Sequence, residues 1–282
     1  MALTRRPEWL KKRIEFDPAR GTSALMEEFG LNTVCREAKC PNISECFRNR
    51  HAAFLILGPS CSRRCRFCHV DKSAPQPADA EEPLRIARAA ERLGLSHVVV
   101  TSVTRDDLPD GGATHFAATV AQLRHAPGVR SIELLIPDLK GDPVAIETIA
   151  RSRPDIIGHN IETVPRLYDL RPGADYERSL NVLTTIKALD ARILTKSAIL
   201  LGLGETEAEV AGAMEDLRDA GCDFLALGQY LRPSLEHAEV KEYAAPERFE
   251  GLKDVGLRMG FSHVESGPYV RSSYRAAAYV NS

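Results

Sequence analysis

The sequence lacks the features that mark several large classes of protein. No apolar run among its 282 residues reaches the roughly 18 residues that a membrane-spanning helix needs. Its first residues, MALTRRPEWLKKR, carry charges but no apolar core behind them, so we expect no secretory signal. No internal repeat is visible. We therefore expect a soluble, cytoplasmic protein with no membrane partner.

A surplus of charge of either sign is also missing. The 37 lysine and arginine residues against 39 aspartate and glutamate residues give a formal net charge of −2. General binding of nucleic acid needs a positive surplus to meet the phosphates, so we expect no nucleic-acid partner. Apolar residues make up 44% and charged residues 27% of the chain, an ordinary globular composition that excludes wholesale disorder.

Cysteine is scarce and unevenly placed. Only seven cysteines occur, and six of them fall within residues 35–68. An odd number in a chain expected to be cytoplasmic argues against a disulfide framework. The seventh, Cys222, stands at the head of the apolar run CDFLALG and is expected to be a buried structural thiol.

Short apolar runs alternate with helix-like segments from residue 53 onward. The expected strands are 53–57, 97–101, 131–136, 155–161, 192–201 and 223–227. The expected helices are 81–93, 113–125, 143–151, 176–189, 205–220 and 246–259. This alternation predicts a parallel sheet built from six βα units, whereas a full eight-fold barrel typically needs about 250 residues for itself.

The predicted fold is therefore an α/β partial (β/α)6 TIM-type barrel, with a flat doubly wound sheet as the alternative. The first 50 residues show no strand signal. We expect an N-terminal extension over 1–50, the barrel over 51–260 and a C-terminal extension over 261–282.

A cysteine triplet with the spacing C-x3-C-x2-C directly follows the first predicted strand. Its members are Cys61, Cys65 and Cys68. Three thiolates in one tight loop can each hold one iron of a 4Fe-4S cluster and leave the fourth iron open. A zinc site with His69 as fourth ligand is the alternative. The loop follows the carboxyl end of a barrel strand, and barrel enzymes carry their active sites at that end. This position favours the cluster. The three arginines inside the loop are expected to lower the thiol pKa values.

The first triplet in chain order, which precedes the barrel, has the spacing C-x4-C-x5-C. Its members are Cys35, Cys40 and Cys46. Structural zinc and three unrelated thiols are the simpler interpretations. One zinc ion cannot use six thiolates, so two incomplete triplets this close together favour a second cluster.

The loop C-x3-C-x-aromatic-C after the first strand of a partial barrel resembles the radical S-adenosylmethionine superfamily. Within it, a series of sequence blocks in this order resembles the lipoyl synthase family: CREAKCPNISECF, CSRRCRFC, TSVTRDDLPDGGATHF, HNIETVPRLY, GLGET, GQYLRPS and VRSSY. The resemblance extends from roughly residue 30 to residue 276.

This resemblance implies a sulfurtransferase that inserts two sulfur atoms, at C6 and C8 of an octanoyl chain linked to a lysine of a lipoyl carrier domain. Two S-adenosylmethionine molecules would be consumed per lipoyl group. The target carbons carry no acidic proton, so acid–base side chains cannot activate them and a cofactor-derived radical is needed. Implied partners are the glycine cleavage H protein or a 2-oxoacid dehydrogenase E2 lipoyl domain, an electron donor such as ferredoxin or flavodoxin, and an iron–sulfur carrier protein.

The resemblance also implies roles for individual residues. Cys61, Cys65 and Cys68 would hold the radical cluster. Cys35, Cys40 and Cys46 would hold an auxiliary 4Fe-4S cluster that donates sulfur, with Ser273 of the RSSY block as its fourth ligand. The expected S-adenosylmethionine contacts are Phe67, Ser102, Asn160, Glu162 and Lys196. The alternative for the charged ones is ion pairing among themselves, with Arg105 or Lys196 bound to Glu162.

Other readings remain open from the residues alone. A methylthiotransferase usually carries further domains, and a biotin-synthase-like enzyme lacks the C-x4-C-x5-C block. A ferredoxin-like module needs four cysteines per cluster, and a zinc-stabilised binding protein needs no barrel. A basic N-terminal run could meet an acidic carrier domain or be a solvated helix face; its members are Arg5, Arg6, Lys11, Lys12 and Arg13.

Overall fold

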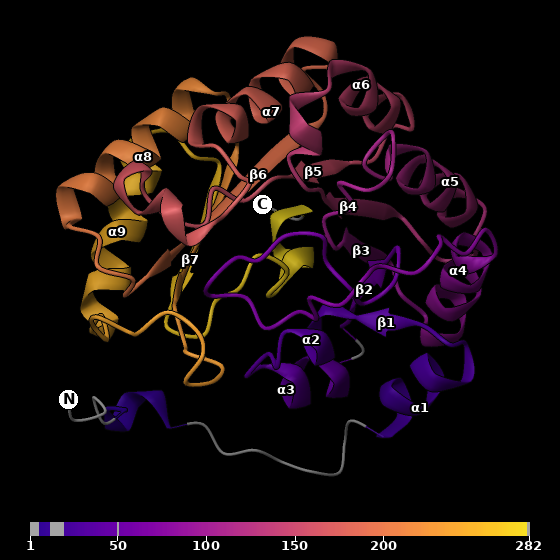
Figure 1. Cartoon of the computed structure of the whole chain (residues 1–282), viewed down its shortest axis with the longest axis horizontal. Helices are drawn as coiled ribbons and strands as arrows, with labels where there is room; N and C mark the ends of the chain where they lie inside the picture. The colour runs from indigo at the N-terminus through magenta and orange to yellow at the C-terminus, as the bar shows by residue number, and fades with distance from the viewer. Residues whose placement is uncertain (1–5, 12–19, 50, 281–282) are drawn as a thin grey trace.

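The computed structural model describes residues 6–11, 20–49 and 51–280. Its centre is one eight-stranded sheet, with the strands in sequential order from β1 to β8. The strands are β1 Asn32–Thr33, β2 Ala53–Ile56, β3 His97–Ser102, β4 Ser131–Leu135, β5 Ile156–Gly158, β6 Leu194–Leu201, β7 Phe224–Gln229 and β8 His263–Gly267. Strands β2 to β8 run parallel, and β1 pairs antiparallel with β2. The sheet curves into an arc that stays open between β1 and β8 (Figure 1).

Six long helices follow the six parallel strands from β2 to β7 and cover the convex face of the arc (Figure 1). They are α4 Glu82–Leu93, α5 Ala113–Arg124, α6 Pro143–Arg151, α7 Tyr176–Leu189, α8 Glu207–Asp219 and α9 Pro246–Arg258. The helices outside this repeat are α1 Arg20–Glu28, α2 Val34–Glu37 and α3 Ile43–Arg48, with 3-10 turns η1 Glu8–Leu10, η2 Leu139–Gly141, η3 Pro165–Leu170 and η4 Ala276–Val280.

The predicted partial barrel of six βα units is confirmed, and each predicted strand and helix is present within a few residues of its expected bounds. Two strands were not expected. Strand β1 lies in the segment that showed no strand signal, because two residues are too short to form a pattern. Strand β8, HVESG, carries only one fully buried side chain and so lacks the apolar run of the others. Both strands lie outside the expected barrel segment in sequence, and they form the two edges of the sheet.

Local sequence explains where the helices begin and end. Thr206 and Glu209 form a reciprocal capping box that starts α8. Asp142 accepts a hydrogen bond from the Val144 amide ahead of Pro143, which starts α6. Gly94 ends α4 in the left-handed conformation that glycine adopts without strain.

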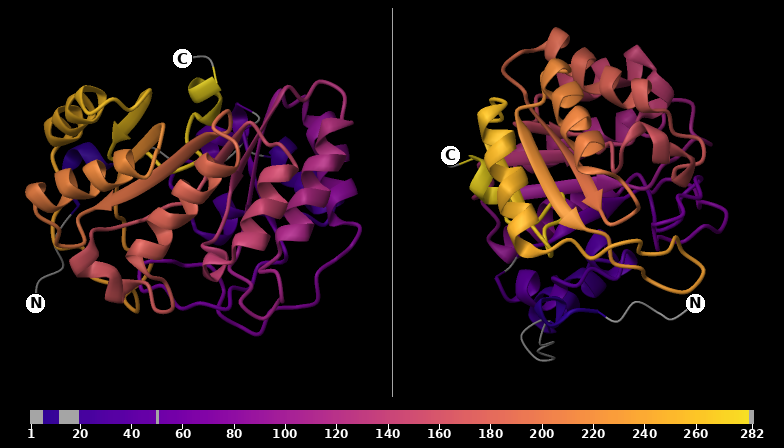
Figure 2. Two further views of the ribbon diagram at one scale, coloured as in Figure 1. Left: turned by 90° about the horizontal axis from the view of Figure 1, so that it is seen from above. Right: turned by 90° about the vertical axis from the view of Figure 1, so that its left-hand side faces the viewer.

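The concave face of the sheet is covered by the chain's own C-terminal segment, which lies inside the arc in Figure 1 and leaves the molecule at the top of the left view in Figure 2. Val270 packs on Ala198 of β6 and Ala226 of β7. Tyr279 packs on Phe224 of β7 and Ile156 of β5. The small side chains of Ala198 and Ala226 leave room for Val270.

No helix in the described part of the chain is both long and apolar enough to cross a membrane.

Gly228 should prove essential for seating the tail. A Cβ atom there would lie 2.1 Å from the carbonyl oxygen of Val270, a backbone atom that cannot move alone. Gly228→Ala should therefore lower the free energy of unfolding by about 1–3 kcal/mol, as overpacking does. Gly251→Ala is the control, because a Cβ at this exposed position of α9 meets nothing within 4 Å. It should stabilise the protein by about 0.5–1 kcal/mol. Urea unfolding of both variants checks this, and equal stabilities would contradict the described seating of the tail.

Candidate functional site

The loop carrying the second triplet emerges from the carboxyl end of β2 and is fixed to three neighbouring segments by backbone hydrogen bonds. The Cys61 amide donates to Asp71 at 2.8 Å, and the Ser62 amide donates to Thr104 at 2.9 Å. The Arg66 amide donates to Leu170, in the segment after β5, at 2.8 Å. The three thiols are half-buried and unpaired by disulfides. The loop is thus held at the mouth formed by the carboxyl ends of the strands, as its sequence position predicted.

The expectation that the loop arginines lower the thiol pKa values is wrong. Burial raises the pKa of Cys65 to about 11, and the cation that opposes this rise is Arg171, from another loop. Burial also raises the pKa of Cys68. Arg63 is buried in ion pairs with two aspartates, whereas Arg64 and Arg66 are exposed. All three arginines are adjacent to the thiols in sequence, but the Arg63 side chain binds Asp106 and Asp138, and those of Arg64 and Arg66 face solvent.

The first triplet shares one cavity with the tail serine. Cys35, Cys40, Cys46 and Ser273 all line this cavity, although Ser273 is more than 200 residues away in sequence. Two side-chain hydrogen bonds hold the tail against α3 and the turn before it. The Tyr274 hydroxyl donates to Glu45 at 2.9 Å, and Asn42 donates to the carbonyl oxygen of Tyr269 at 2.6 Å.

This donor set fits a cluster better than a single ion. Among residues 6–11, 20–49 and 51–280, no group of three or more histidine, cysteine or acidic side chains is placed to hold one metal ion. A zinc ion needs four ligands at about 2.0–2.3 Å from one point. A 4Fe-4S cluster places its irons at separate corners, so its ligands surround a volume instead. The cavity bordered by three thiols and Ser273 has this character.

Asn160 and Glu162 lie just after β5 and are linked to the tail. Asn160 donates to Glu162 at 3.0 Å and accepts from the Ser272 hydroxyl at 3.0 Å. Glu162 has a positive φ of 64°, a strained conformation for this residue type. Desolvation raises the pKa of Glu162, and the nearby Arg171 and Asn160 oppose this rise. Glu162 is also close enough to Cys65 to influence its pKa.

Two buried polar atoms after the strands have no hydrogen-bond partner among the described residues. They are Oγ of Ser102, at the end of β3, and Nε2 of His159, after β5. Burial lowers the pKa of His159 to about 4, and Nδ1 donates to the Ile136 carbonyl at 2.9 Å, so Nε2 is left as a bare acceptor. Buried polar atoms of this kind are normally bonded, so both side chains have unused hydrogen-bonding capacity.

Lys196 and Arg105 do not join these residues. Lys196 is fully buried, binds Glu133 of β4 at 2.9 Å and lies 3.7 Å from the ring centroid of Tyr279. Arg105 pairs with Asp107 and donates to the carbonyl oxygen of Leu57. The alternative that Arg105 or Lys196 binds Glu162 is therefore wrong, and the Lys196 ammonium is already committed inside the barrel.

The remaining sequence-derived candidates have mixed outcomes. Phe67 is half-buried within the cysteine loop. The glycine-rich turn at Gly202 is held from within, because Glu205 accepts hydrogen bonds from the Gly202 and Leu203 amides. Cys222 is fully buried, as expected, and burial raises its pKa to about 12.

Only part of the basic N-terminal run lies within the described residues. Arg5, Lys12 and Arg13 lie outside the described residues. Arg6 is exposed, and Lys11 pairs with Glu8.

Comparison with known proteins decides the family. The model of the radical SAM superfamily matches residues 55–228, from β2 to β7. A lipoyl synthase of Caldanaerobacter subterraneus subsp. tengcongensis is 58% identical over 273 residues, covering 96% of each chain. A lipoyl synthase of Geobacter metallireducens is 56% identical and covers 99% of each chain. This chain belongs to the lipoyl synthase family of the radical SAM superfamily. Like the other lipoyl synthases, it is an enzyme of the sulfurtransferase class.

Solved structures agree on the fold. Methylornithine synthase superposes with a TM-score of 0.56 at 15% identity, over 89% of this chain and 79% of that one. The FeFe-hydrogenase maturase HydG from Carboxydothermus hydrogenoformans superposes with a TM-score of 0.60 at 15% identity, over 74% and 52%. At such low identity these structures support the partial barrel of a lipoyl synthase, and the fold alone.

The buried pair of Lys196 and Glu133 should behave as a structural element. Lys196→Met leaves the buried Glu133 carboxylate without its ammonium partner and with only the longer contact to His97, at 3.4 Å, so it should cost about 3–5 kcal/mol of stability. The double variant Lys196→Met/Glu133→Leu should recover most of this loss, because neither charge then remains. Anaerobic urea unfolding measures both effects.

The matched control is Lys241→Met, which breaks an exposed pair with Glu239 and should change stability by about 1 kcal/mol or less. Weaker S-adenosylmethionine binding by Lys196→Met at unchanged stability would instead favour the cofactor contact.

Proposed function

We propose that this lipoyl synthase inserts two sulfur atoms, at C6 and C8 of a protein-bound octanoyl-lysine, and consumes two S-adenosylmethionine molecules per lipoyl group. The observation that carries the proposal is the cavity that Ser273 shares with Cys35, Cys40 and Cys46. A second thiol triplet lies at the mouth of the same barrel. Both triplets lack a fourth thiolate, which suits one cluster that binds a cofactor and another that gives up sulfide.

The residues at the mouth would hold the radical cluster and its cofactor. Cys61, Cys65 and Cys68 would be the three thiolate ligands. When bound, the two clusters and S-adenosylmethionine supply the hydrogen-abstracting radical and the sulfur that no side chain can provide. The unpartnered Ser102 oxygen and the carboxylate of Glu162 are suited to the polar groups of S-adenosylmethionine, with Asn160 orienting Glu162 and Phe67 near the adenine.

Ser273 supports a donor role for the auxiliary site. Serine would offer a hard oxygen to an iron that prefers sulfur, so Ser273 would hold its iron less firmly than the three thiolates would. A cluster held in this way would suit the donation of sulfide to the substrate. Arg271 lines the cavity of the first triplet. Desolvation lowers the pKa of its guanidinium, and the nearby Cys40 and Glu162 oppose this shift. Its positive charge would offset the negative charge of the auxiliary cluster.

The loops above the mouth would exclude water from the radical chemistry. Arg171 donates to the carbonyl of Ile161 at 2.9 Å and to the Tyr168 hydroxyl at 2.6 Å, which secures the segment after β5 beside the cysteine loop. A lipoyl carrier domain, from glycine cleavage H protein or an E2 subunit, would present its octanoyl arm there. Ferredoxin or flavodoxin would supply electrons and an iron–sulfur carrier would rebuild the auxiliary cluster, all in the cytoplasm.

Cysteine variants should separate the two proposed clusters. The anaerobically purified protein should hold about eight iron atoms, and each triplet replaced by alanine should reduce this to about four. Replacing Cys61, Cys65 and Cys68 should abolish 5′-deoxyadenosine formation. Replacing Cys35, Cys40 and Cys46 should leave that formation measurable but abolish lipoyl product.

Ser273→Ala should lower the yield of lipoyl product more than it lowers cleavage of S-adenosylmethionine. Ser272 lies next to it but outside the proposed ligand set, so Ser272→Ala should retain four irons at the auxiliary site. Normal lipoyl yield from the Cys40→Ala variant would contradict the donor role, and a single cluster in the unaltered protein would contradict the whole proposal.

A further inference from the structure

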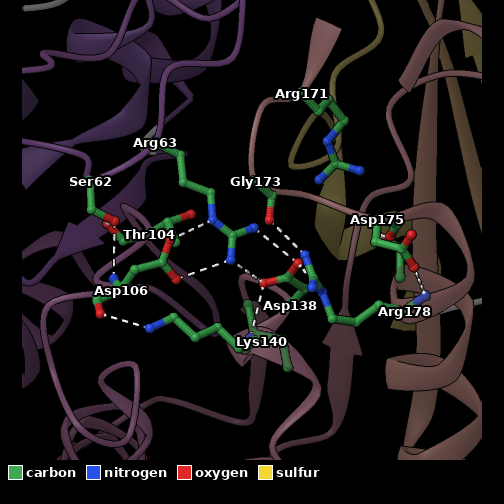
Figure 3. Close-up of polar contacts among 12 residues, drawn as sticks. Ser62, Arg63, Thr104, Asp106, Asp138, Lys140, Arg171, Gly173, Asp175 and Arg178 are labelled. Carbon is green, nitrogen blue, oxygen red and sulfur yellow. Dashed lines mark hydrogen bonds and ion pairs between the residues drawn. The ribbon is translucent and has the colours of Figure 1, made fainter. Parts of the chain in front are cut away.

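Arg63 is a charged side chain of the cysteine loop for which the proposed chemistry has no use. It lies two residues after Cys61, yet its side chain is only 7% exposed and its guanidinium is bound to two aspartates. Its guanidinium binds Asp106 through two hydrogen bonds, of 2.7 and 3.0 Å. It binds Asp138 through two more, of 2.9 and 2.7 Å (Figure 3). Paired hydrogen bonds to each of two carboxylates fix both the position and the plane of the group.

The two carboxylates come from different loops at the barrel mouth. Asp106 follows β3, and its amide donates to the Ser62 hydroxyl at 3.0 Å, so the same loop is tied twice to the cysteine segment. Asp138 follows β4 and its side chain is fully buried. Although burial alone would raise the pKa of Asp138, the hydrogen bonds from Arg63 hold it well below its usual range.

Asp138 extends the connection to a fourth loop. Arg178, in the first turn of α7, donates to Asp138 at 2.8 Å and to the carbonyl oxygen of Gly173 at 2.6 Å (Figure 3). Gly173 packs on the stem of Arg63, since a Cβ there would lie 3.6 Å from it. The loops after β2, β3, β4 and β5 therefore meet around one guanidinium.

We propose that Arg63 is a positioning residue for the radical site, setting the cysteine loop against the barrel mouth through Asp106 and Asp138. This inference rests on the proposed placement of the radical cluster on Cys61, Cys65 and Cys68. The three thiols that would hold that cluster belong to the loop, whereas the side chains suited to the cofactor, Ser102 and Glu162, belong to the barrel. An error of about 1 Å between two such groups can cost as much as a hundredfold in function.

The chemistry of the guanidinium explains why arginine stands here. Its planar fork can serve two carboxylates at once, whereas a lysine ammonium is a point charge that cannot reproduce both paired contacts. Lysine should therefore keep the charge balance but lose the angular constraint. Glutamine should lose both, leaving Asp106 without its cation and Asp138 with Arg178 alone.

The test uses the full chain in two backgrounds, the unaltered protein and the Cys35→Ala/Cys40→Ala/Cys46→Ala variant, in which only the radical cluster can form. Arg63→Gln and Arg63→Lys are compared with Arg64→Gln, the matched control, which removes the same charge from an exposed neighbour in the same loop. After anaerobic reconstitution, iron content, thermal midpoint and the dissociation constant for S-adenosylmethionine are measured. The electron paramagnetic resonance spectrum of the reduced cluster is recorded with and without S-adenosylmethionine.

Arg63→Gln should bind S-adenosylmethionine between about tenfold and a hundredfold more weakly and show a diminished spectral response to it. Arg63→Lys should fall between this variant and the unaltered protein, and Arg64→Gln should match the unaltered protein. Should Arg63→Gln fail to hold its cluster or to fold, the Arg63→Lys comparison decides.

Unchanged affinity and spectral response in Arg63→Gln would overturn the positioning role, as would equal losses in Arg64→Gln. So would a lowered thermal midpoint with normal cofactor binding, which marks a merely structural pair. Failure of the unaltered protein to show any cluster or response to S-adenosylmethionine would instead overturn the proposed function on which the inference rests.

Discussion

An open parallel sheet must have its concave face covered, and this requirement governs the rest of the molecule. The helices cover only the convex face, so the C-terminal segment fills the interior (Figure 1). The C-terminal segment fits there because the residues that face it include small ones, above all Gly228. The Val270 backbone packs directly against Gly228. The same seating carries Ser273 to the cavity of the first cysteine triplet. Packing of the fold and assembly of the site therefore depend on one segment.

Three arginine side chains near the barrel mouth have different roles. Arg63 joins loops through Asp106 and Asp138, and Arg171 secures the segment after β5 while opposing the rise in the Cys65 pKa. Arg271 lines the cavity of Cys35, Cys40 and Cys46, and Glu162 is close enough to influence its pKa. Positive charge in a confined site is costly unless it is paired. Pairing with two aspartates fixes the Arg63 guanidinium in one place, which suits a site that must hold charged groups in a stable geometry.

The repeating part of the fold could be predicted because strands buried on both faces leave continuous apolar runs, and capping residues such as Thr206 mark the helix ends. Strand β8 could not, because HVESG is largely polar at a sheet edge. In the site, the spacing of the thiols identified both triplets, and only family resemblance indicated Ser273. The partners of Lys196 and Arg63 depend on tertiary contacts with Glu133 and Asp138, each more than 60 residues away in sequence. No local pattern encodes such pairs.

The proposed function depends on transfer to the substrate of sulfide that Cys35, Cys40, Cys46 and Ser273 would hold in the auxiliary cluster. Its most direct test is to reconstitute the enzyme with isotopically heavy sulfide, remove the excess, and allow one turnover on an octanoylated carrier peptide with reductant and S-adenosylmethionine in a buffer holding light sulfide. Mass spectrometry should find two heavy sulfur atoms in each lipoyl group formed. Product carrying light sulfur from the buffer would show that the cluster is not the donor.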